Sequence, residues 1–412
     1  MRLLSFALFL IVTIASSALA GPSDSGKFIV HEWGTFTSFA GSDGISLEFR
    51  PLVSSDLPDF VFDRLKQAKL FNARFDAGDH SIYTAKSSVR SLQRMETPVT
   101  YFYTDRERTV DVSVMFPKGL LTEFYPPVRM MLPIFAKGQP EQLANSSLTW
   151  EKVKLIPNSS IKSTMLPPPT SNADHYGLAR ATDSAMLQID DKLINKTYYE
   201  KFLFYRGVGN FDLPVSLEST ADGQFTIHNG GNEPIHAAFL IQINNGHIRC
   251  ANLGHIDKDL AAALPQNEIT IGQLCDEVAS AIVADGMYEK EARAMVNTWR
   301  SSWFGEEGTR LLYLLPQSLT DKMIPLKVTP APDKTVRVMV GRLETLTPQI
   351  EKNIENLVVQ LASPMPAQRD AAMAAIVKFG RFAEPALQRV CKISDDPEIK
   401  ARAKELLIKL QK

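Results

Sequence analysis

Residues 235–253 read IHAAFLIQINNGHIRCANL, with an Asn-Gly pair at 245–246. This pair is the strongest short signal for a two-residue hairpin turn, because both of its residues adopt positive φ angles readily. A turn there places Ile241 opposite Cys250 on two antiparallel strands. The stretch therefore predicts a β-hairpin. The residues expected on its core face are Ile235, Ala237, Phe239, Ile241, Ile243 and Cys250.

The sequence from residue 28 to residue 346 has mainly strand character on both sides of this hairpin. Short runs rich in Val, Ile, Phe, Tyr and Thr end at Gly, Asn, Asp or Pro. A second hairpin is expected where residues 100–103 and 109–116 flank a polar turn. Helical spacing of apolar residues appears at 269–284 and 289–300. The expected fold class is α+β, with a β-rich body of sandwich-like antiparallel sheets and inserted helices.

The chain divides by composition into five expected regions. These are a leader at 1–20, a β-rich region at 21–157, an exposed connection at 158–174, a second β-rich region with helices at 175–346, and a helical module at 347–412. The connection is inferred from its Pro-Pro-Pro run and several serines, which show no periodic pattern.

The last sixty-five or so residues carry explicit helix signals. Thr347-Pro348 and Asp396-Pro397 each place a capping side chain before a proline at the first helical position. The order of Arg369-Asp370-Ala371-Ala372, Gly380 and Pro385-Ala386-Leu387 resembles short bacterial HEAT-like repeats. A solenoid with so few repeats has too small a core to be stable alone, so it must pack against another surface. We expect the β-rich body, or a protein partner bound through these helices, to cover Leu357, Leu361, Leu387, Leu406 and Leu410.

The first twenty residues have the pattern of a secretory signal. Arg2 precedes an apolar run, and Ala18-Leu19-Ala20 forms a small-residue cleavage site. We therefore expect cleavage after Ala20 and a periplasmic or secreted protein. No later apolar run approaches the length of a membrane span.

Composition excludes some partners and cofactor sites. The formal net charge is −1, so nucleic acid is not an expected partner. Cys250, Cys275 and Cys391 lie too far apart for a disulfide framework or a usual zinc cluster. A Cys250–Cys275 bridge and three free thiols both stay open. No phosphate-loop, nucleophile-elbow or zinc-protease motif occurs, and the sequence identifies no cofactor.

Several long strings in the body are specific enough to mark a family. They are HEWGTFTSFAGSDG from His31, METPVTYFYTDR from Met95, FPKGLLTEFYPP from Phe116, EKFLFYRGVGNF from Glu200 and EARAMVNTWRSSWFGEEGTRLLYLLP from Glu291. Together they resemble an uncharacterised family of exported bacterial proteins of the planctomycete and myxobacterial type. The resemblance implies export and brings no reaction, ligand or catalytic residue with it.

Three histidines are candidate metal ligands. The hairpin register places His236 opposite His255, and a turn near Asn232 would place His228 opposite His236 on the next strand. Opposed side chains lie within reach of one zinc or copper ion bound by imidazoles. The alternative is three solvated histidines at the rim of a sheet.

The first strand of the body supplies a second set of candidates. Alternation places His31 and Trp33 on one face and Glu32 on the other, apolar face. A buried carboxylate needs a basic or hydrogen-bonding partner, and Arg206 is the expected one. Glu32 is then either half of a structural ion pair or a catalytic acid or base.

Aromatic and acidic residues form a third set near residue 300. Trp299 and Trp303 precede Glu306 and Glu307, and rings with carboxylates are typical of carbohydrate sites. Spacing of four residues on a helix serves core packing equally well. Adjacent glutamates also point apart, unlike the facing carboxylates of a glycosidase.

Two functions are consistent with these observations. The first is an exported binding or assembly protein, with a ligand on the body and an interaction module at the C-terminus. The alternative is an exported hydrolase, metal-dependent or not, that acts on carbohydrate or peptide. Its cleft would include His31, Glu32, Arg206 and Glu306 or Glu307.

Overall fold

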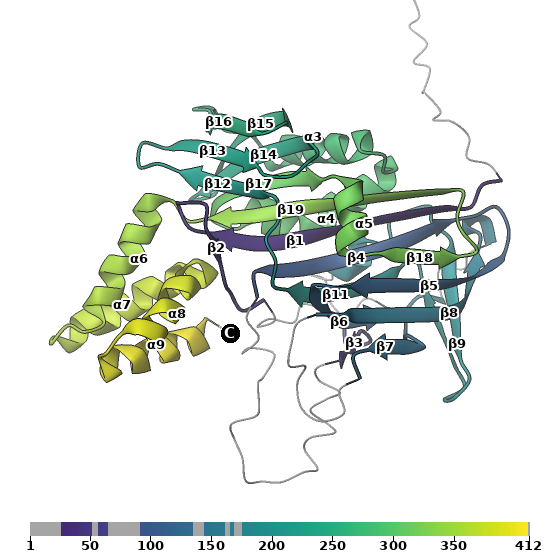
Figure 1. Cartoon of the computed structure of the whole chain (residues 1–412), viewed down its shortest axis with the longest axis horizontal. Coiled ribbons are helices and arrows are strands. Elements are labelled where there is room, and N and C mark those ends of the chain that lie inside the picture. Colours follow the sequence, from purple (N-terminus) through teal and green to yellow (C-terminus); the bar gives the residue numbers. More distant parts are fainter. Residues whose placement is uncertain are drawn as a thin grey trace, which may run out of the picture.

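The computed structural model describes residues 26–51, 57–64, 91–134, 144–160, 165–168 and 175–410. The expected signal at 1–20 and most of the expected connection at 158–174 lie outside these residues. A body made mainly of strands carries a group of helices at one end (Figure 1). The predicted α+β class, with a β-rich body and a helical C-terminal module, is confirmed.

Ten strands of the described chain form the largest sheet, in the order β15-β14-β17-β19-β1-β4-β11-β6-β3, with β2 beside β1. β1 and β19 at its centre run parallel, and their other neighbours are antiparallel. Every residue of β1 is buried, so both faces of the sheet are covered here. The strands are β1 (Ile29–Ala40), β2 (Ser46–Leu47), β3 (Phe62–Asp63), β4 (Gln93–Tyr103), β6 (Gly119–Tyr125), β11 (Leu203–Gly209), β14 (Ile235–Asn244), β15 (His247–Ile256), β17 (Gly308–Leu315) and β19 (Lys334–Thr345).

Two smaller sheets complete the strands of the described body. One has the order β10-β9-β8-β5-β18, with β7 also paired to β8, and the other has the order β12-β13-β16. Their strands are β5 (Arg108–Phe116), β7 (Met130–Leu132), β8 (Ser146–Ile156), β9 (Met186–Asp191), β10 (Lys196–Glu200), β12 (Val215–Ser219), β13 (Gln224–Asn229), β16 (Asp259–Ala263) and β18 (Leu326–Thr329).

The hairpin expected around residues 104–108 is wrong. β4 pairs with β1 and β11, whereas β5 pairs with β8 and β18 in another sheet. The polar segment between β4 and β5 therefore carries the chain from one sheet to the next. A short polar connection does not by itself tell a hairpin from such a crossing.

The hairpin at 245–246 is confirmed, with Ile241 opposite Cys250 as expected. Its core face is only partly as predicted, because the register shifts between Ile235 and Phe239. Ile235 consequently packs on the opposite side of the sheet from Phe239 and Ile241. Both sides are buried, so this strand is not amphipathic.

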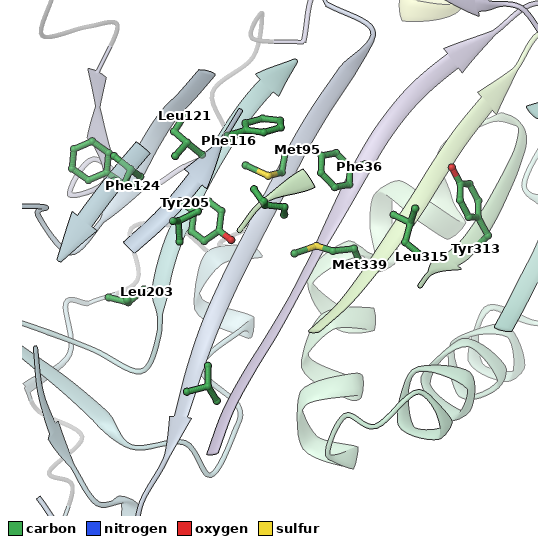
Figure 2. Packing of buried hydrophobic residues seen from close by; sticks show 14 of the residues in the cluster. Phe36, Met95, Phe116, Leu121, Phe124, Leu203, Tyr205, Tyr313, Leu315 and Met339 are labelled. Carbon is green, nitrogen blue, oxygen red and sulfur yellow. The ribbon is translucent and has the colours of Figure 1, made fainter. Parts of the chain in front are cut away.

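Two hydrophobic cores cover the two faces of the large sheet. The first core lies between this sheet and the smaller sheets, and Figure 2 shows part of it, including Phe36 of β1, Met95 of β4 and Met339 of β19. The second core lies against α3 (Ile271–Ala284), α4 (Glu289–Gly305) and α2 (His175–Leu178). Both inserted helices predicted at 269–300 are thus present. Thr270 begins α3 with a capping box. The body also contains α5 (Gln317–Met323) and the 3-10 turn η2 (Asn158–Ser160).

The helical module comprises α6 (Pro348–Gln360), α7 (Pro366–Lys378), η4 (Gly380–Ala383), α8 (Glu384–Ile393) and α9 (Pro397–Lys409). The Asp396 side chain accepts the N–H groups of Glu398 and Ile399, as a capping residue does. Gly380 follows α7 with a φ of 55°, a conformation that favours glycine at the end of a helix. Both predicted helix starts and this stop are present, but the Thr347 side chain makes no capping hydrogen bond, unlike that of Asp396.

The module has a core of its own and is joined to the body by a few side chains. Leu361, Leu387 and Leu406 are fully buried, mainly among other residues of the module, while Leu47 and Leu346 of the body pack at the edge of this core. The expected contact with the body is therefore present, but these leucines do not make most of it.

Other residues make the contact between body and module. The ring of Phe382 lies 5.8 Å from that of Phe39, edge to face. Arg50 forms an ion pair with Glu384, and Ser42 Oγ donates to Glu351 at 2.6 Å. Polar and aromatic contacts thus fix the module at this position.

Phe382→Ala should loosen this contact. Its ring is half-buried, so we expect a loss of about 2 kcal/mol of unfolding free energy, less than for a fully buried Phe. Limited proteolysis of the full chain should release the module faster, and urea denaturation measures the loss. Val377→Ala, on the exposed side of α7, is the control. Equal proteolysis of both variants would show that Phe382 does not hold the module.

Candidate functional site

His31 lies in a buried polar cluster at the start of α4. Its Nδ1 is 2.7 Å from Glu291 Oε2, and Tyr103 Oη donates to Glu291 Oε1 at 2.7 Å. The Tyr288 N–H also donates to Glu291, at 2.9 Å, and the ring of Tyr288 lies 4.5 Å from that of His31. Burial, followed by the charge of Glu291, raises the pKa of Tyr103. These contacts attach the first turn of α4 to β1 and β4.

Glu32 is buried on the other face, where a different set of groups satisfies it. Arg337 Nε donates to Oε2 at 2.7 Å, and Nη2 of the same guanidinium lies 2.6 Å from that oxygen in an ion pair. The hydroxyls of Thr100 and Tyr205 donate to Oε1 at 2.8 and 2.6 Å. The expected partner Arg206 was therefore wrong, because it lies beside Tyr205 on the strand and points to the opposite face. Arg337, Thr100 and Tyr205 thus give Glu32 the partners of a structural ion pair, which is one of the two roles expected for it.

Arg206 instead belongs to a band of buried charges on the face of the large sheet that packs against the second core. It lies opposite Glu123 on β6, and β4 carries both Arg94 and Glu96. Thr37 Oγ1 donates to Glu96 at 2.8 Å. Burial alone would raise the pKa of Glu96, but Arg94, Arg342 and Arg206 outweigh it and hold that pKa below its usual value.

The row of histidines predicted from the register does not form. His228 lies in the three-stranded sheet, opposite Ser216 and Asp259, and not beside His236. Each histidine has its own acidic neighbour: His228 contacts Asp259 at 2.9 Å, His236 contacts Asp285 at 2.6 Å and His255 contacts Asp257 at 2.9 Å. Among the described residues, no group of three or more His, Cys, Asp and Glu side chains could hold a metal ion.

Trp299 and Trp303 belong to the second core. Their rings are stacked 6.3 Å apart and almost fully buried. They are not a ligand platform, and the packing alternative describes them correctly. The glutamates that follow them are placed differently.

Glu306 and Glu307 lie in the loop after α4, which a network of buried charges fixes. Arg310 donates from Nη1 to the carbonyls of Ser302 and Trp303, and from Nη2 to those of both glutamates. It therefore satisfies carbonyls at the end of α4 that have no partner within the helix.

The two carboxylates are oriented separately. Arg342 Nη2 donates to Glu306 at 2.8 Å and Arg342 Nε donates to Glu344 at 2.6 Å, and Glu344 also accepts from Arg310 Nε at 3.2 Å. The Glu307 carboxylate accepts the N–H groups of the hairpin turn at 245 and 246, at 2.9 and 3.1 Å. Each side chain thus has a defined direction before any ligand binds.

These glutamates line a cleft of about 650 Å³ between body and module, which we name the junction cleft. Its walls come from the end of β14, the loop between α4 and β17, the start of α6 and the segment after α7. Side chains facing it include the amides of Gln242, Asn244 and Gln349 and the rings of Phe379 and Phe382. The cleft has the size of a small-molecule site.

The five catalytic candidates therefore do not converge. His31, Glu32 and Arg206 belong to three separate sets of contacts, and Glu306 and Glu307 line the junction cleft. The sequence did not reveal Glu291, Arg310, Arg342 and Glu344, although for the last three a charged residue in an otherwise apolar strand was a usable signal. It also gave no sign that Phe379 and Phe382 would face the body, since that depends on how the module packs.

The three cysteines are free thiols. Burial, and then the charge of Glu277, raises the pKa of Cys250 to about 12. No helix within the described ranges is long and apolar enough to cross a membrane.

No family model and no curated protein matches the sequence. Among solved structures, the chain is similar to the Fcho1 Mu homology domain of Danio rerio with bound Eps15 peptide. The match has 6% identity and a TM-score of 0.25, and covers 79% of this chain and 96% of that one. A TM-score this low supports no conclusion about this chain.

The Glu32–Arg337 pair gives a test of buried charge. Arg337→Met keeps most of the volume but leaves Glu32 buried without its cation, so we expect a loss of about 3 kcal/mol of unfolding free energy. Adding Glu32→Gln removes the unpaired charge and should restore at least half of that loss. Urea denaturation measures both. A double variant that loses as much as the two single variants combined would contradict the pairing.

Proposed function

We propose that this chain is an exported binding protein whose ligand occupies the junction cleft. Export is supported by the charged, apolar and small-residue pattern of the first twenty residues and by the resemblance to a family of exported bacterial proteins. Binding is supported by the cleft between body and module.

The side chains of the cleft favour an oligosaccharide as the ligand. The half-buried rings of Phe379 and Phe382 offer apolar surface to the face of a sugar ring. The amides of Gln242, Asn244 and Gln349 can donate to and accept from hydroxyl groups, and Glu307 can accept from them. The observation that carries this proposal is the presence of rings, amides and a carboxylate in one preformed cleft.

The same geometry favours binding over hydrolysis. A glycosidase needs two carboxyl groups that face one another across the scissile bond. In the junction cleft, Glu306 is directed toward Arg342 and Glu307 toward the turn at 245–246. Both carboxylates are engaged by the protein, so they are placed to orient a ligand and not to act as an acid and nucleophile pair.

Export predicts a shortened N-terminus. Mass spectrometry of the protein from its native host should find an N-terminus at or near Gly21, because cleavage is expected after Ala20. A mature protein that retains Met1 would contradict export and would leave the binding proposal unaffected.

Ligand binding can be tested with soluble cello-, xylo- and chito-oligosaccharides. Calorimetry of the mature protein should detect binding of at least one of them, and Gln349→Trp should weaken it at least tenfold, about 1.4 kcal/mol, by filling the cleft. Gln360→Trp is the matched control, at the exposed far end of α6. Its binding should equal that of the unmodified protein.

Two outcomes would contradict this proposal in different ways. Short peptides that bind in place of the sugars, and are blocked by Gln349→Trp, would show that the ligand class is wrong. Sugars that bind with equal affinity to both tryptophan variants would show that the junction cleft is not the site.

A further inference from the structure

Lys201 lies at the corner between β10 and β11 and is 6% exposed. Its Nζ donates to Asn158 Oδ1 at 3.1 Å. Asn158 itself is exposed, so the amine of Lys201 lies beside a surface residue of the body. A neutral amide is thus the side-chain partner of this ammonium group in the part of the chain that the structure describes.

The nearby carboxylates are engaged by other cations. Arg180 Nε and Nη2 donate to the two oxygens of Glu200 at 2.9 and 2.8 Å. Lys290 Nζ donates to Asp183 at 2.7 Å. Three cations therefore share two carboxylates at this corner, and Lys201 is the one whose ammonium is bonded to neither.

Local hydrogen bonds fix the backbone of Lys201. Its N–H donates to Glu200 Oε1 at 2.8 Å, and Ser184 Oγ donates to its carbonyl at 3.0 Å. Ser184 Oγ in turn lies 2.9 Å from Thr182 Oγ1. The backbone from which the Lys201 side chain extends is therefore fixed, and the ammonium group is bonded to Asn158.

Burial without a bonded counterion favours the neutral amine. Burial is the main cause that lowers the pKa of Lys201, to about 8; Asp183 and Glu200 oppose the shift and Lys290 adds to it. An exposed lysine has a pKa of about 10.4, so at pH 7.5 Lys201 carries on the order of 100-fold more neutral amine. Burial and a neighbouring cation are known ways to activate a lysine.

We propose that Lys201 is a nucleophilic amine that captures small aldehydes or ketones as an imine. The lone pair of Nζ attacks the carbonyl carbon and a carbinolamine forms. Both amine hydrogens then leave with the carbonyl oxygen as water, and a C=N bond remains. Small carbonyl compounds are specified because little of the side chain reaches the surface.

The test is reductive alkylation of the full mature chain with acetaldehyde and cyanoborohydride, read by mass spectrometry of the peptides. At pH 7.5 Lys201 should react at least tenfold faster than the exposed Lys192. The ratio of its rate to that of Lys192 should stay constant below about pH 8 and fall above it, because the neutral fraction of Lys201 levels off there while that of Lys192 still rises. A rate no faster than that of Lys192 at pH 7.5, or a ratio that does not fall above pH 8, would overturn the proposal.

Asn158→Asp is a sharper variant of the same test. It places a carboxylate where the amide now accepts from Nζ, with almost the same shape. The ammonium form is then favoured, and labelling of Lys201 at pH 7.5 should slow about tenfold while Lys192 is unchanged. An unchanged Lys201 rate would contradict the explanation. The pH profile of the unmodified chain tests the proposal even if this variant fails to fold.

Discussion

The arrangement of this protein depends on one constraint, which is that charged side chains in a sheet covered on both faces must be paired inside it. Glu32 and Arg337 meet this constraint on one face, and Arg310, Arg342 and Glu344 meet it on the other. A buried charge that loses its partner is strongly destabilising. The strands that carry these residues are therefore held in one register, and the loop after α4 is held with them. The junction cleft has a fixed wall for this reason.

Local signals in the sequence predicted the parts of the fold that depend on local physics. The Asn-Gly turn, the helix starts at Thr347-Pro348 and Asp396-Pro397, and Gly380 all mark element ends that the structure contains. The crossing from β4 to β5 was not predicted, because a polar connection of the same kind can join two strands of one sheet or of two. The bulge near Ala238 was missed as well, since nothing in the local sequence marks the register shift.

The site was predictable only where a single segment contains it. Glu306 and Glu307 were chosen from their place beside aromatic residues, and they do line a cleft, although the aromatic residues that face it come from the helical module. Arg337 was not recognised as the partner of Glu32, because the two lie 305 residues apart and pair only through the central strands. The histidine row failed for a related reason, as His228 belongs to a different sheet from His236. Contacts between distant segments depend on which strands become neighbours in a sheet. The spacing of residues within one segment does not predict this.

The parallel pairing of β1 with β19 has a consequence for how the chain is completed. These are the first and last strands of the described body, and they are neighbours at the middle of the large sheet. A chain that emerges from its N-terminus exposes one edge of β1 until residues 334–345 have followed, because no earlier strand fills that place. Such long-range pairing slows folding and leaves an intermediate whose unpaired strand edge is prone to aggregation. The large sheet is therefore completed only when β19 pairs between β17 and β1. A chaperone that covers the unpaired edge of β1 during synthesis would protect this edge from aggregation.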